Sequence, residues 1–305
     1  MKLSSQQYSS FFEDGYVVIP SVLGDADISP LIQSYNEEID TLAQELFAQN
    51  RIPELFEDQP FETRLVNICK FDEETYRTAN EAFDLMYIRT QAIFEFLRNQ
   101  NLLDIIEGIL GPEITCSPIQ HVRCKLPASL WDGTDSYKAP WHQDAQVHTE
   151  DADPHFILTV WIPLCDTDEQ NGCLQVIPKG HQSSTVYWSQ GFGISSDNLP
   201  QKNIISLPMK KGDVLLVHKL TPHASEPNQT NAIRWSLDLR YQKSGTPTGR
   251  SCYPDFIARS HQNPESELRD YTTWDQLWQE ALEEYPIKTP REHKPDRPVH
   301  QNISL

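Results

Sequence analysis

The chain has 305 residues, of which 38% are hydrophobic and 23% charged, a composition typical of a globular protein with enough apolar material for a core. Its formal net charge of -19 disfavours nucleic acid and anionic membranes as partners, because both require a basic protein face. The 22 prolines against 12 glycines predict many loops and strand edges, which argues against a simple helical bundle.

The cysteines and the N-terminus indicate a cellular compartment. None of the six cysteines forms a C-x-x-C pair, so neither a zinc knuckle nor a disulfide scaffold is indicated and reduced thiols are expected. The N-terminus lacks the apolar segment of a signal peptide. No stretch approaches the roughly 18 apolar residues that span a membrane. We therefore expect a soluble, cytoplasmic protein with no membrane partner, and its oligomeric state stays open.

The first third of the chain is predicted to be mostly helical. Ser29 and Pro30 resemble an N-cap followed by proline at the first helical position, and apolar residues then recur at helical spacing. Further helices are expected at about 79–98 and 102–110, the second ended by Gly111 and Pro112. We interpret these helices as a packing wall.

From about residue 114 short apolar or alternating segments are separated by turn residues. Such a pattern predicts strands, and many short strands predict a mainly β fold, an antiparallel jelly roll with flanking helices. The expected strands lie near 114–125, 155–163, 173–177, 213–218 and 232–242, with irregular, functional loops at 126–140, 187–203 and 243–262 and a last helix near 274–284. We expect a single domain over 1–305, with a helical part (1–112), a jelly-roll core (113–245) and a C-terminal loop and helix (246–305).

Two histidines and one aspartate are the candidate metal ligands. His142 and Asp144 are two residues apart, so on an extended segment they point the same way, with Gln143 between them facing elsewhere. His223 follows the apolar strand that ends near His218. Two imidazoles and a carboxylate suit Fe(II) and leave three adjacent positions open on an octahedral ion, enough for a bidentate keto acid and O2.

Arg234 is the candidate anion-binding residue. It begins a strand on which Ile233, Trp235, Leu237 and Leu239 alternate with Arg234, Ser236, Asp238 and Arg240. The first set is expected to pack on the hydrophobic side, so Arg234 and Ser236 share the opposite face. A buried guanidinium requires an anionic partner, and a dicarboxylate co-substrate supplies one.

Each of these elements has a plainer interpretation when it is taken alone. A His-x-Asp pair occurs by chance in many chains, His223 can be a turn residue, and Arg234 can pair with a surface carboxylate. His218 competes with His223 as the second histidine ligand. The order and spacing of all the elements together favour a functional site.

In this order the motifs resemble those of the phytanoyl-CoA dioxygenase family of Fe(II)/2-oxoglutarate oxygenases. The likeness rests on FFEDGYVVIP at 11–20, LGPE at 110–113, WHQD at 141–144, WIPL at 161–164, NGCLQVIPKGH at 171–181, KGDVLL at 211–216, and the segments around His223 and Arg234. The resemblance implies a double-stranded β-helix with N-terminal helices packed on it. Lys179 and Gly180 replace the glycine and serine usual in one turn of the family, so a locally altered turn is expected there.

The resemblance also implies roles for single residues. Iron would be held by His142, Asp144 and His223, and the far carboxylate of 2-oxoglutarate by Arg234 with Ser236. Thr159 and Lys125 match positions that often touch the co-substrate. Because Asp144 is present, where halogenating relatives have a small residue, hydroxylation is favoured over halogenation.

The implied reaction uses Fe(II), 2-oxoglutarate and O2 to hydroxylate an unactivated C–H bond of a small molecule, with succinate and CO2 as co-products; desaturation or ring formation would be variants. The negative net charge mildly favours a neutral, zwitterionic or cationic substrate over a CoA thioester. Five aromatic residues of the long loops can line a substrate pocket or merely pack, namely Trp131, Tyr137, Tyr187, Trp188 and Phe192. The competing functions are a zinc hydrolase or isomerase and a non-catalytic sensor or scaffold.

Overall fold

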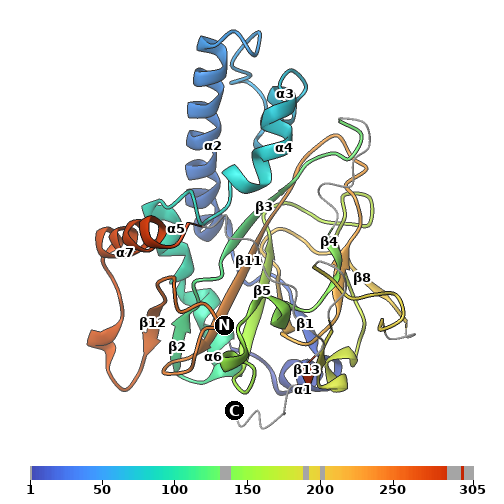
Figure 1. Ribbon diagram of the computed structural model, residues 1–305, viewed down its shortest axis with the longest axis vertical. Helices are drawn as coiled ribbons and strands as arrows, with labels where there is room; N and C mark the ends of the chain where they lie inside the picture. Colours follow the sequence, from blue (N-terminus) through green and yellow to red (C-terminus); the bar gives the residue numbers. More distant parts are fainter. Residues whose placement is uncertain (1, 131–138, 188–191, 200–202, 287–296, 299–305) are drawn as a thin grey trace.

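The computed structural model describes residues 2–130, 139–187, 192–199, 203–286 and 297–298 (Figure 1). Its helices are α1 (Ser5–Asp14), α2 (Asp25–Ala48), α3 (Phe61–Cys69), α4 (Glu73–Ala82), α5 (Gln91–Leu97), α6 (Gln100–Leu110) and α7 (Tyr271–Glu284). Its strands are β1 (Tyr16–Ile19), β2 (Glu113–Cys116), β3 (His121–Lys125), β4 (Ala139–His142), β5 (Ile157–Pro163), β6 (Leu174–Val176), β7 (Thr185–Val186), β8 (Ile205–Leu207), β9 (Val214–His218), β10 (His223–Ser225), β11 (Arg234–Lys243), β12 (Phe256–Ser260) and β13 (Arg297–Pro298).

Two antiparallel sheets make up the core. The larger has seven strands in the order β1-β9-β5-β11-β2-β12, with β3 also paired to β11, and the smaller has the order β4-β10-β6-β8. Apolar residues of β5 and β9, such as Trp161 and Val217, meet Val176 of β6 and Leu207 of β8 between the sheets. The predicted jelly-roll class with flanking helices is confirmed.

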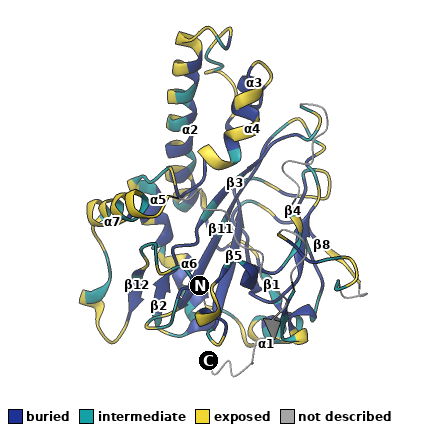
Figure 2. Ribbon diagram, viewed as in Figure 1, coloured by how far each residue is buried: buried dark blue, intermediate teal, exposed yellow. Residues whose placement is uncertain are grey.

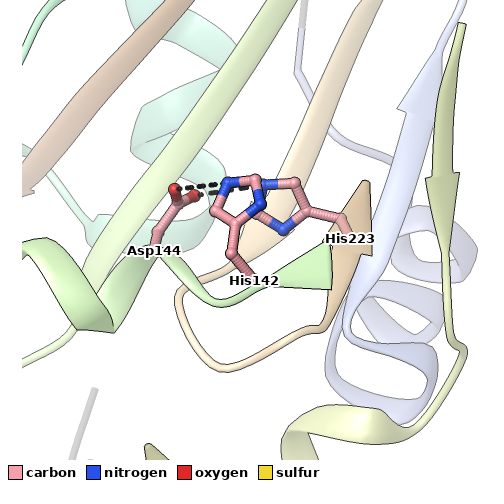
Figure 3. A group of neighbouring side chains, drawn as sticks. All are labelled: His142, Asp144 and His223. Atoms are coloured by element: carbon pink, nitrogen blue, oxygen red, sulfur yellow. Dashed lines mark ion pairs between the residues drawn. The ribbon is translucent and has the colours of Figure 1, made fainter. Parts of the chain in front are cut away.

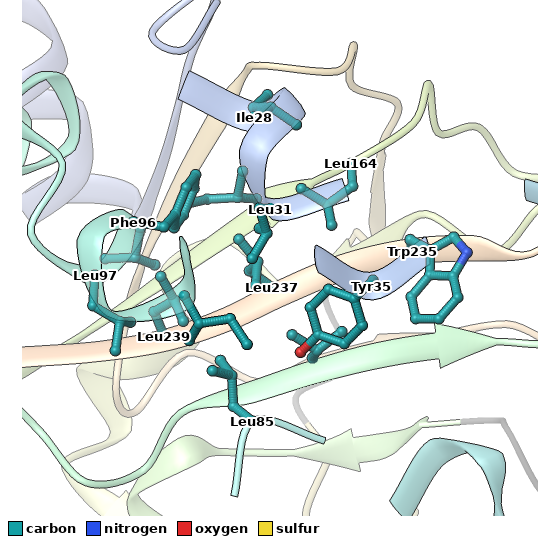
Figure 4. Close-up of a cluster of buried hydrophobic side chains, with 14 of the residues drawn as sticks. Ile28, Leu31, Tyr35, Leu85, Phe96, Leu97, Leu164, Trp235, Leu237 and Leu239 are labelled. Atoms are coloured by element: carbon teal, nitrogen blue, oxygen red, sulfur yellow. The ribbon is translucent and has the colours of Figure 1, made fainter. Parts of the chain in front are cut away.

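The helices cover the other face of the large sheet (Figures 1 and 2). Helix α2 places Leu31 and Tyr35 against Trp235, Leu237 and other residues of β11, as Figure 4 shows. The Trp235 ring also stacks on Phe61 of α3, with centroids 4.9 Å apart. Strand β11 is therefore buried on both sides, and the predicted alternation of its side chains is confirmed.

Helix α2 begins earlier than expected. The prediction of Ser29 as N-cap is wrong: the helix starts at Asp25, and the Asp27 carboxylate accepts a hydrogen bond from the Gly24 backbone N–H, 2.8 Å away. Pro30 therefore lies inside the helix, where it donates no backbone hydrogen bond. Burial of Leu31 and the rest of the apolar face against the sheet offsets this loss.

The single helix expected at 79–98 is two helices. Between α4 and α5 the Asp84 carboxylate accepts from the Met86 N–H, and the Thr90 hydroxyl caps α5 by accepting from the Ile93 N–H. Polar side chains that bind the backbone in this way end one helix and begin another. The predicted helix near 102–110 is confirmed and ends at Gly111, whose φ of 81° suits glycine.

Two strand predictions also need correction. The strand expected over 114–125 is divided into β2 and β3, because Gln120 turns back to donate to the carbonyls of Ser117 and Arg240. The stretch 243–262, expected to be irregular, contains β12, which pairs with β2 through main-chain bonds that leave no signal in side-chain pattern. The last predicted helix is confirmed as α7, with Trp274 and Trp278 in the core.

Three further features bear on the sequence-based expectations. All six cysteines are free. Within the described residues no helix is both long and apolar enough to cross a membrane. Lys179 occupies the left-handed region with φ 62°, and its ammonium contacts Glu13 of α1 at 2.8 Å, so the turn is locally held by an ion pair.

Leu237→Ala tests the contribution of the helix-facing side of β11. Because Leu237 is 1% exposed, we expect the free energy of unfolding to fall by about 2–5 kcal/mol, measured by urea denaturation. The matched control Leu277→Ala, at a position 39% exposed on α7, is expected to change it by less than about 0.5 kcal/mol. Equal losses in the two variants would contradict the assignment of β11 to the core.

Candidate active site

His142, Asp144 and His223 converge in one cluster (Figure 3). His142 ends β4 and His223 begins β10, and the two residues are direct partners in the antiparallel pairing of these strands. The Nε2 atoms of His142 and His223 lie 4.0 and 3.9 Å from the two carboxylate oxygens of Asp144. One potential ligand atom from each residue lies within 4.8 Å of the others, so the three can contact one metal ion.

Both imidazoles present the nitrogen that a metal needs. Nδ1 of His142 lies 2.7 Å from the Pro140 carbonyl, and Nδ1 of His223 lies 3.0 Å from that of Thr221. A carbonyl only accepts, so both Nδ1 atoms carry the proton and both Nε2 lone pairs face Asp144. Burial, followed by the neighbouring His223 ring, lowers the pKa of His142 to about 4, which keeps the imidazole neutral as ligation requires.

Gln143 orients the segment that carries two of these residues. It is fully buried, its amide donates to the carbonyls of Thr185 and Leu220, and its oxygen accepts from the Tyr187 N–H. Its backbone is extended, with φ -121° and ψ 137°, before a 3-10 turn begins at Asp144. The expected geometry, with Gln143 facing away from its two neighbours, is therefore present, although Asp144 itself lies outside the strand.

Asp144 is held by two side chains of the large sheet. Arg240 donates to Oδ1 at 2.6 Å, and the Thr159 hydroxyl donates to Oδ2. Burial by itself would raise the pKa of Asp144, but Arg240 and the two histidines hold it well below its ordinary value. The carboxylate therefore stays ionised, as a metal ligand must.

Arg240 was not among the residues singled out from the sequence. Its signal was present, because the alternation that places Arg234 and Ser236 on the cavity side of β11 places Arg240 there too. The register between β11 and β5 could not be predicted from the sequence. It pairs Arg240 with Thr159 of β5 and so brings both side chains to Asp144.

Arg234 differs from Arg240 in its lack of a negative partner. It is 4% exposed, and among the described residues no carboxylate lies within ion-pair distance of it. Nη1 donates to the Ser236 hydroxyl at 2.6 Å, the guanidinium lies 5.4 Å from the Trp161 ring centre, and Nε has no hydrogen-bond partner in the described structure. Burial lowers the pKa of Arg234 to about 10, so the group is still charged at neutral pH. A buried, unneutralised guanidinium is suited to an anionic ligand.

A cavity of about 250 Å³ joins these groups. Its lining includes the three clustered residues together with Thr159, Lys125 and Arg234. Lys125 is the cross-strand partner of Arg234, and its ammonium donates to the Glu226 carbonyl at 2.7 Å. All the predicted site residues except Ser236, which contacts Arg234, therefore surround a single space.

Other candidate residues are placed differently. His218 lies outside the cluster, since its ring packs on His181 and Phe156 and its Nδ1 accepts from the Leu220 N–H. Phe192 lines the cavity, with its ring 4.8 Å from that of His142. Tyr187 contacts Gln143 through its backbone, whereas Trp131, Tyr137 and Trp188 lie outside the described residues.

The cluster fits a redox-active divalent metal. Two neutral imidazole nitrogens and one carboxylate oxygen are the donor set of a facial triad, and no thiolate, which would favour zinc, lies in the described cluster. Each donor is fixed by a further hydrogen bond, as in metal sites generally.

The model of the family described as phytanoyl-CoA dioxygenase (PhyH) matches residues 11–236, well over half of the chain. The chain belongs to the phytanoyl-CoA dioxygenase family. A curated relative is the peroxisomal phytanoyl-CoA dioxygenase of Bos taurus, 23% identical over 280 residues that cover 88% of this chain and 75% of the relative. The resemblance inferred from the sequence motifs is confirmed.

Solved structures show the same fold. The non-haem monooxygenase ThoJ superposes with a TM-score of 0.58 at 18% identity, covering 90% of this chain and 97% of its own. The epimerase SnoN, in a structure with Fe3+, α-ketoglutarate and nogalamycin RO, superposes with a TM-score of 0.53 at 17% identity, covering 80% of this chain and 86% of its own. The predicted cofactors, iron and 2-oxoglutarate, agree with membership of the family and with the His–Asp–His cluster.

Arg240→Met tests whether the cluster holds a cation. The substitution leaves the Asp144 carboxylate buried without its main counter-charge, so we expect the metal-free protein to lose about 3–5 kcal/mol of unfolding free energy. A divalent ion bound by the cluster replaces that charge, so Mn(II) is expected to restore most of the loss in thermal unfolding.

Arg259→Met is the matched control. Arg259 is also buried and ion-paired, with Glu107 at 2.8 Å and Asp104 at 3.0 Å, but it lies outside the cavity lining. Mn(II) should therefore not restore its stability beyond the effect on the unsubstituted protein. Equal restoration of both variants would count against a metal at Asp144.

Proposed function

We propose that the protein is an Fe(II)/2-oxoglutarate-dependent dioxygenase that hydroxylates an unactivated C–H bond of a small organic molecule and releases succinate and CO2. The observation that carries this proposal is a pair of features in one cavity. A buried His–Asp–His cluster lies beside a buried arginine that has no carboxylate partner in the described structure. Membership of the phytanoyl-CoA dioxygenase family supports the same reaction class.

The proposed ligands of iron are His142, Asp144 and His223. Iron bound by these residues, together with 2-oxoglutarate and O2, supplies the oxidising power that breaks a C–H bond. The backbone carbonyls behind both imidazoles keep Nε2 directed at the ion, and Arg240 with Thr159 keeps the carboxylate in one orientation. Such preorganisation fixes which positions stay open for co-substrate and O2.

Arg234 and Ser236 are the proposed anchor for the far carboxylate of 2-oxoglutarate. The guanidinium can donate two parallel hydrogen bonds to a carboxylate, and the Ser236 hydroxyl lies beside it. Lys125, opposite Arg234 across the two strands, adds a second positive charge at this end of the cavity. The guanidinium also lies over the Trp161 ring, 5.4 Å from its centre, so one side of it faces an aromatic surface.

Asp144 also supports hydroxylation over halogenation. The carboxylate occupies a ligand position that a halide would need, and its contacts with Arg240 and Thr159 hold it there. A zinc hydrolase or isomerase could use the same three ligands, but it would have no role for an unneutralised Arg234. A non-catalytic sensor or scaffold would have no need to keep both groups.

The proposed partner is a small molecule, because the site residues line a concave cavity, whose volume of about 250 Å³ is close to the lower end of ligand-pocket sizes. We further propose a cytoplasmic location, because six free cysteines are suited to a reducing compartment. The Bos taurus relative is named as peroxisomal, so localisation of a tagged chain in its native cell is the direct test.

Anaerobic titration with Fe(II) and then 2-oxoglutarate tests the cofactor pair through the visible charge-transfer band of the chelate. In a buffer without halide, which could take the place of the carboxylate, we expect a band in the unsubstituted protein and a strongly weakened one in Asp144→Ala. In Arg234→Met the iron should still bind, but the dissociation constant for 2-oxoglutarate should rise about tenfold to a hundredfold, because hydrogen bonds to charged groups contribute about 1.5–3 kcal/mol.

Arg259→Met again serves as the control, with an expected affinity for 2-oxoglutarate close to that of the unsubstituted protein. A normal band in Asp144→Ala would contradict the assignment of the ligands. The absence of any band in the unsubstituted protein, together with tight zinc binding, would favour the hydrolase or scaffold alternatives.

A further inference from the structure

The cavity has a second cationic position besides the proposed co-substrate anchor. Strand β3 lies beside β11 with Lys125 opposite Arg234, Arg123 opposite Ser236 and His121 opposite Asp238. All of these except Ser236 line the cavity. Arg123 therefore lies two residues before Lys125 on the same face of β3, opposite Ser236 and two pairs away from Arg234.

The Arg123 guanidinium contacts one carboxylate and is otherwise partly exposed to the cavity. Its described polar contact is a single one, from Nη1 to Asp84 Oδ2 at 3.4 Å, and its side chain is 36% exposed. The same Asp84 oxygen accepts a shorter bond of 2.8 Å from Nδ1 of His121. Asp84 is therefore shared, and most of the five N–H donors of Arg123 stay available to a ligand.

Each acid near the cavity has a side-chain partner. Arg240 contacts Asp144 at 2.6 Å and Asp238 at 3.1 Å, and Asp84 is bound by His121 and Arg123. A cationic substrate would thus find no unpaired carboxylate among the described residues of the lining. An anionic one would find the N–H donors of Arg123 that its single long contact with Asp84 leaves unused. The local charges differ in this respect from the net charge of -19, which by itself favoured neutral, zwitterionic or cationic substrates.

We propose that the Arg123 guanidinium, oriented by Asp84, binds a carboxylate group of the primary substrate, so that the substrate is an organic acid. The planar guanidinium fork binds a carboxylate through two parallel hydrogen bonds, which fixes both the position and the orientation of the substrate. This inference rests on the proposed function, because it assigns Arg234 to 2-oxoglutarate and Arg123 to the molecule that is oxidised.

The test compares two fluorinated probes of the same shape, para-trifluoromethylbenzoate and para-trifluoromethylbenzamide, by fluorine NMR. Both are titrated into the anaerobic protein with Fe(II) and saturating 2-oxoglutarate, so that Arg234 is occupied. We expect the acid to bind about tenfold or more tightly than the amide in the unsubstituted protein. Arg123→Gln should abolish this preference, Arg123→Lys should keep part of it, and Arg259→Gln should keep all of it.

The titration with 2-oxoglutarate distinguishes whether Arg123 binds a carboxylate of the substrate or a carboxylate of 2-oxoglutarate. Arg123→Gln should leave the affinity for 2-oxoglutarate within about twofold, whereas Arg234→Met weakens it by the tenfold or more expected for a lost charged hydrogen bond. A tenfold loss of 2-oxoglutarate affinity in Arg123→Gln would assign Arg123 to the co-substrate and overturn the proposal.

Equal binding of acid and amide by the unsubstituted protein, or an acid preference that survives in Arg123→Gln, would also overturn it. Failure of the proposed function has a different signature, because no charge-transfer band would then form in any variant. Thermal unfolding of Arg123→Gln and Arg123→Lys establishes that both variants are folded before binding is compared.

Discussion

Strand β11 is buried on both faces, and the structure depends on the alternation of its side chains. On one face Trp235 and Leu237 pack under helices α2 and α3, and on the other Arg234 and Arg240 enter the cavity. A shift of one residue in its pairing would place apolar side chains in the cavity and two arginines in the helical core. The hydrophobic packing that stabilises the sheet thus also fixes the register of the charged groups.

Arg234 and Arg240 lie on the same face of this strand, but their surroundings shift their pKa values in opposite directions. Arg240 contacts two carboxylates, and burial, which by itself lowers the pKa, is outweighed by Asp144 and Asp238 so that its pKa is raised. Arg234 has no such partner in the described structure, and burial lowers its pKa to about 10. One guanidinium therefore neutralises a carboxylate of the proposed metal-binding cluster, and the other is left for the anion that it is proposed to bind.

The pairing of β11 with β3 and β5 places the charged groups of the cavity. Asp144 supplies negative charge at the proposed metal-binding cluster. Arg234 and Lys125 supply positive charge at the proposed co-substrate end, and Arg123 supplies it where the substrate is proposed to lie. Each group is fixed by a neighbouring strand or by a buried acceptor, so little reorganisation is required when ligands enter.

Much of the site was readable from the sequence because the relevant signals are local. The two-residue spacing of His142 and Asp144, and the alternation from Ile233 to Arg240, depend only on extended backbone geometry. Helix α6 ends at Gly111 for a similarly local reason, since glycine tolerates a positive φ. The start of α2 and the break between α4 and α5 were misjudged, because side chains such as Asp27 and Thr90 bind the backbone in ways that apolar periodicity does not reveal.

The sequence by itself determined the strand face, the ligand types and the family motifs, all of which depend on residues close together in the chain. The tertiary structure decided what depends on register between distant strands. It brought Arg240 of β11 and Thr159 of β5 to Asp144, and it placed Arg123 beside the proposed co-substrate anchor. It also left Arg234 without a carboxylate partner in the described structure, a property that exists only once the surrounding strands have buried it.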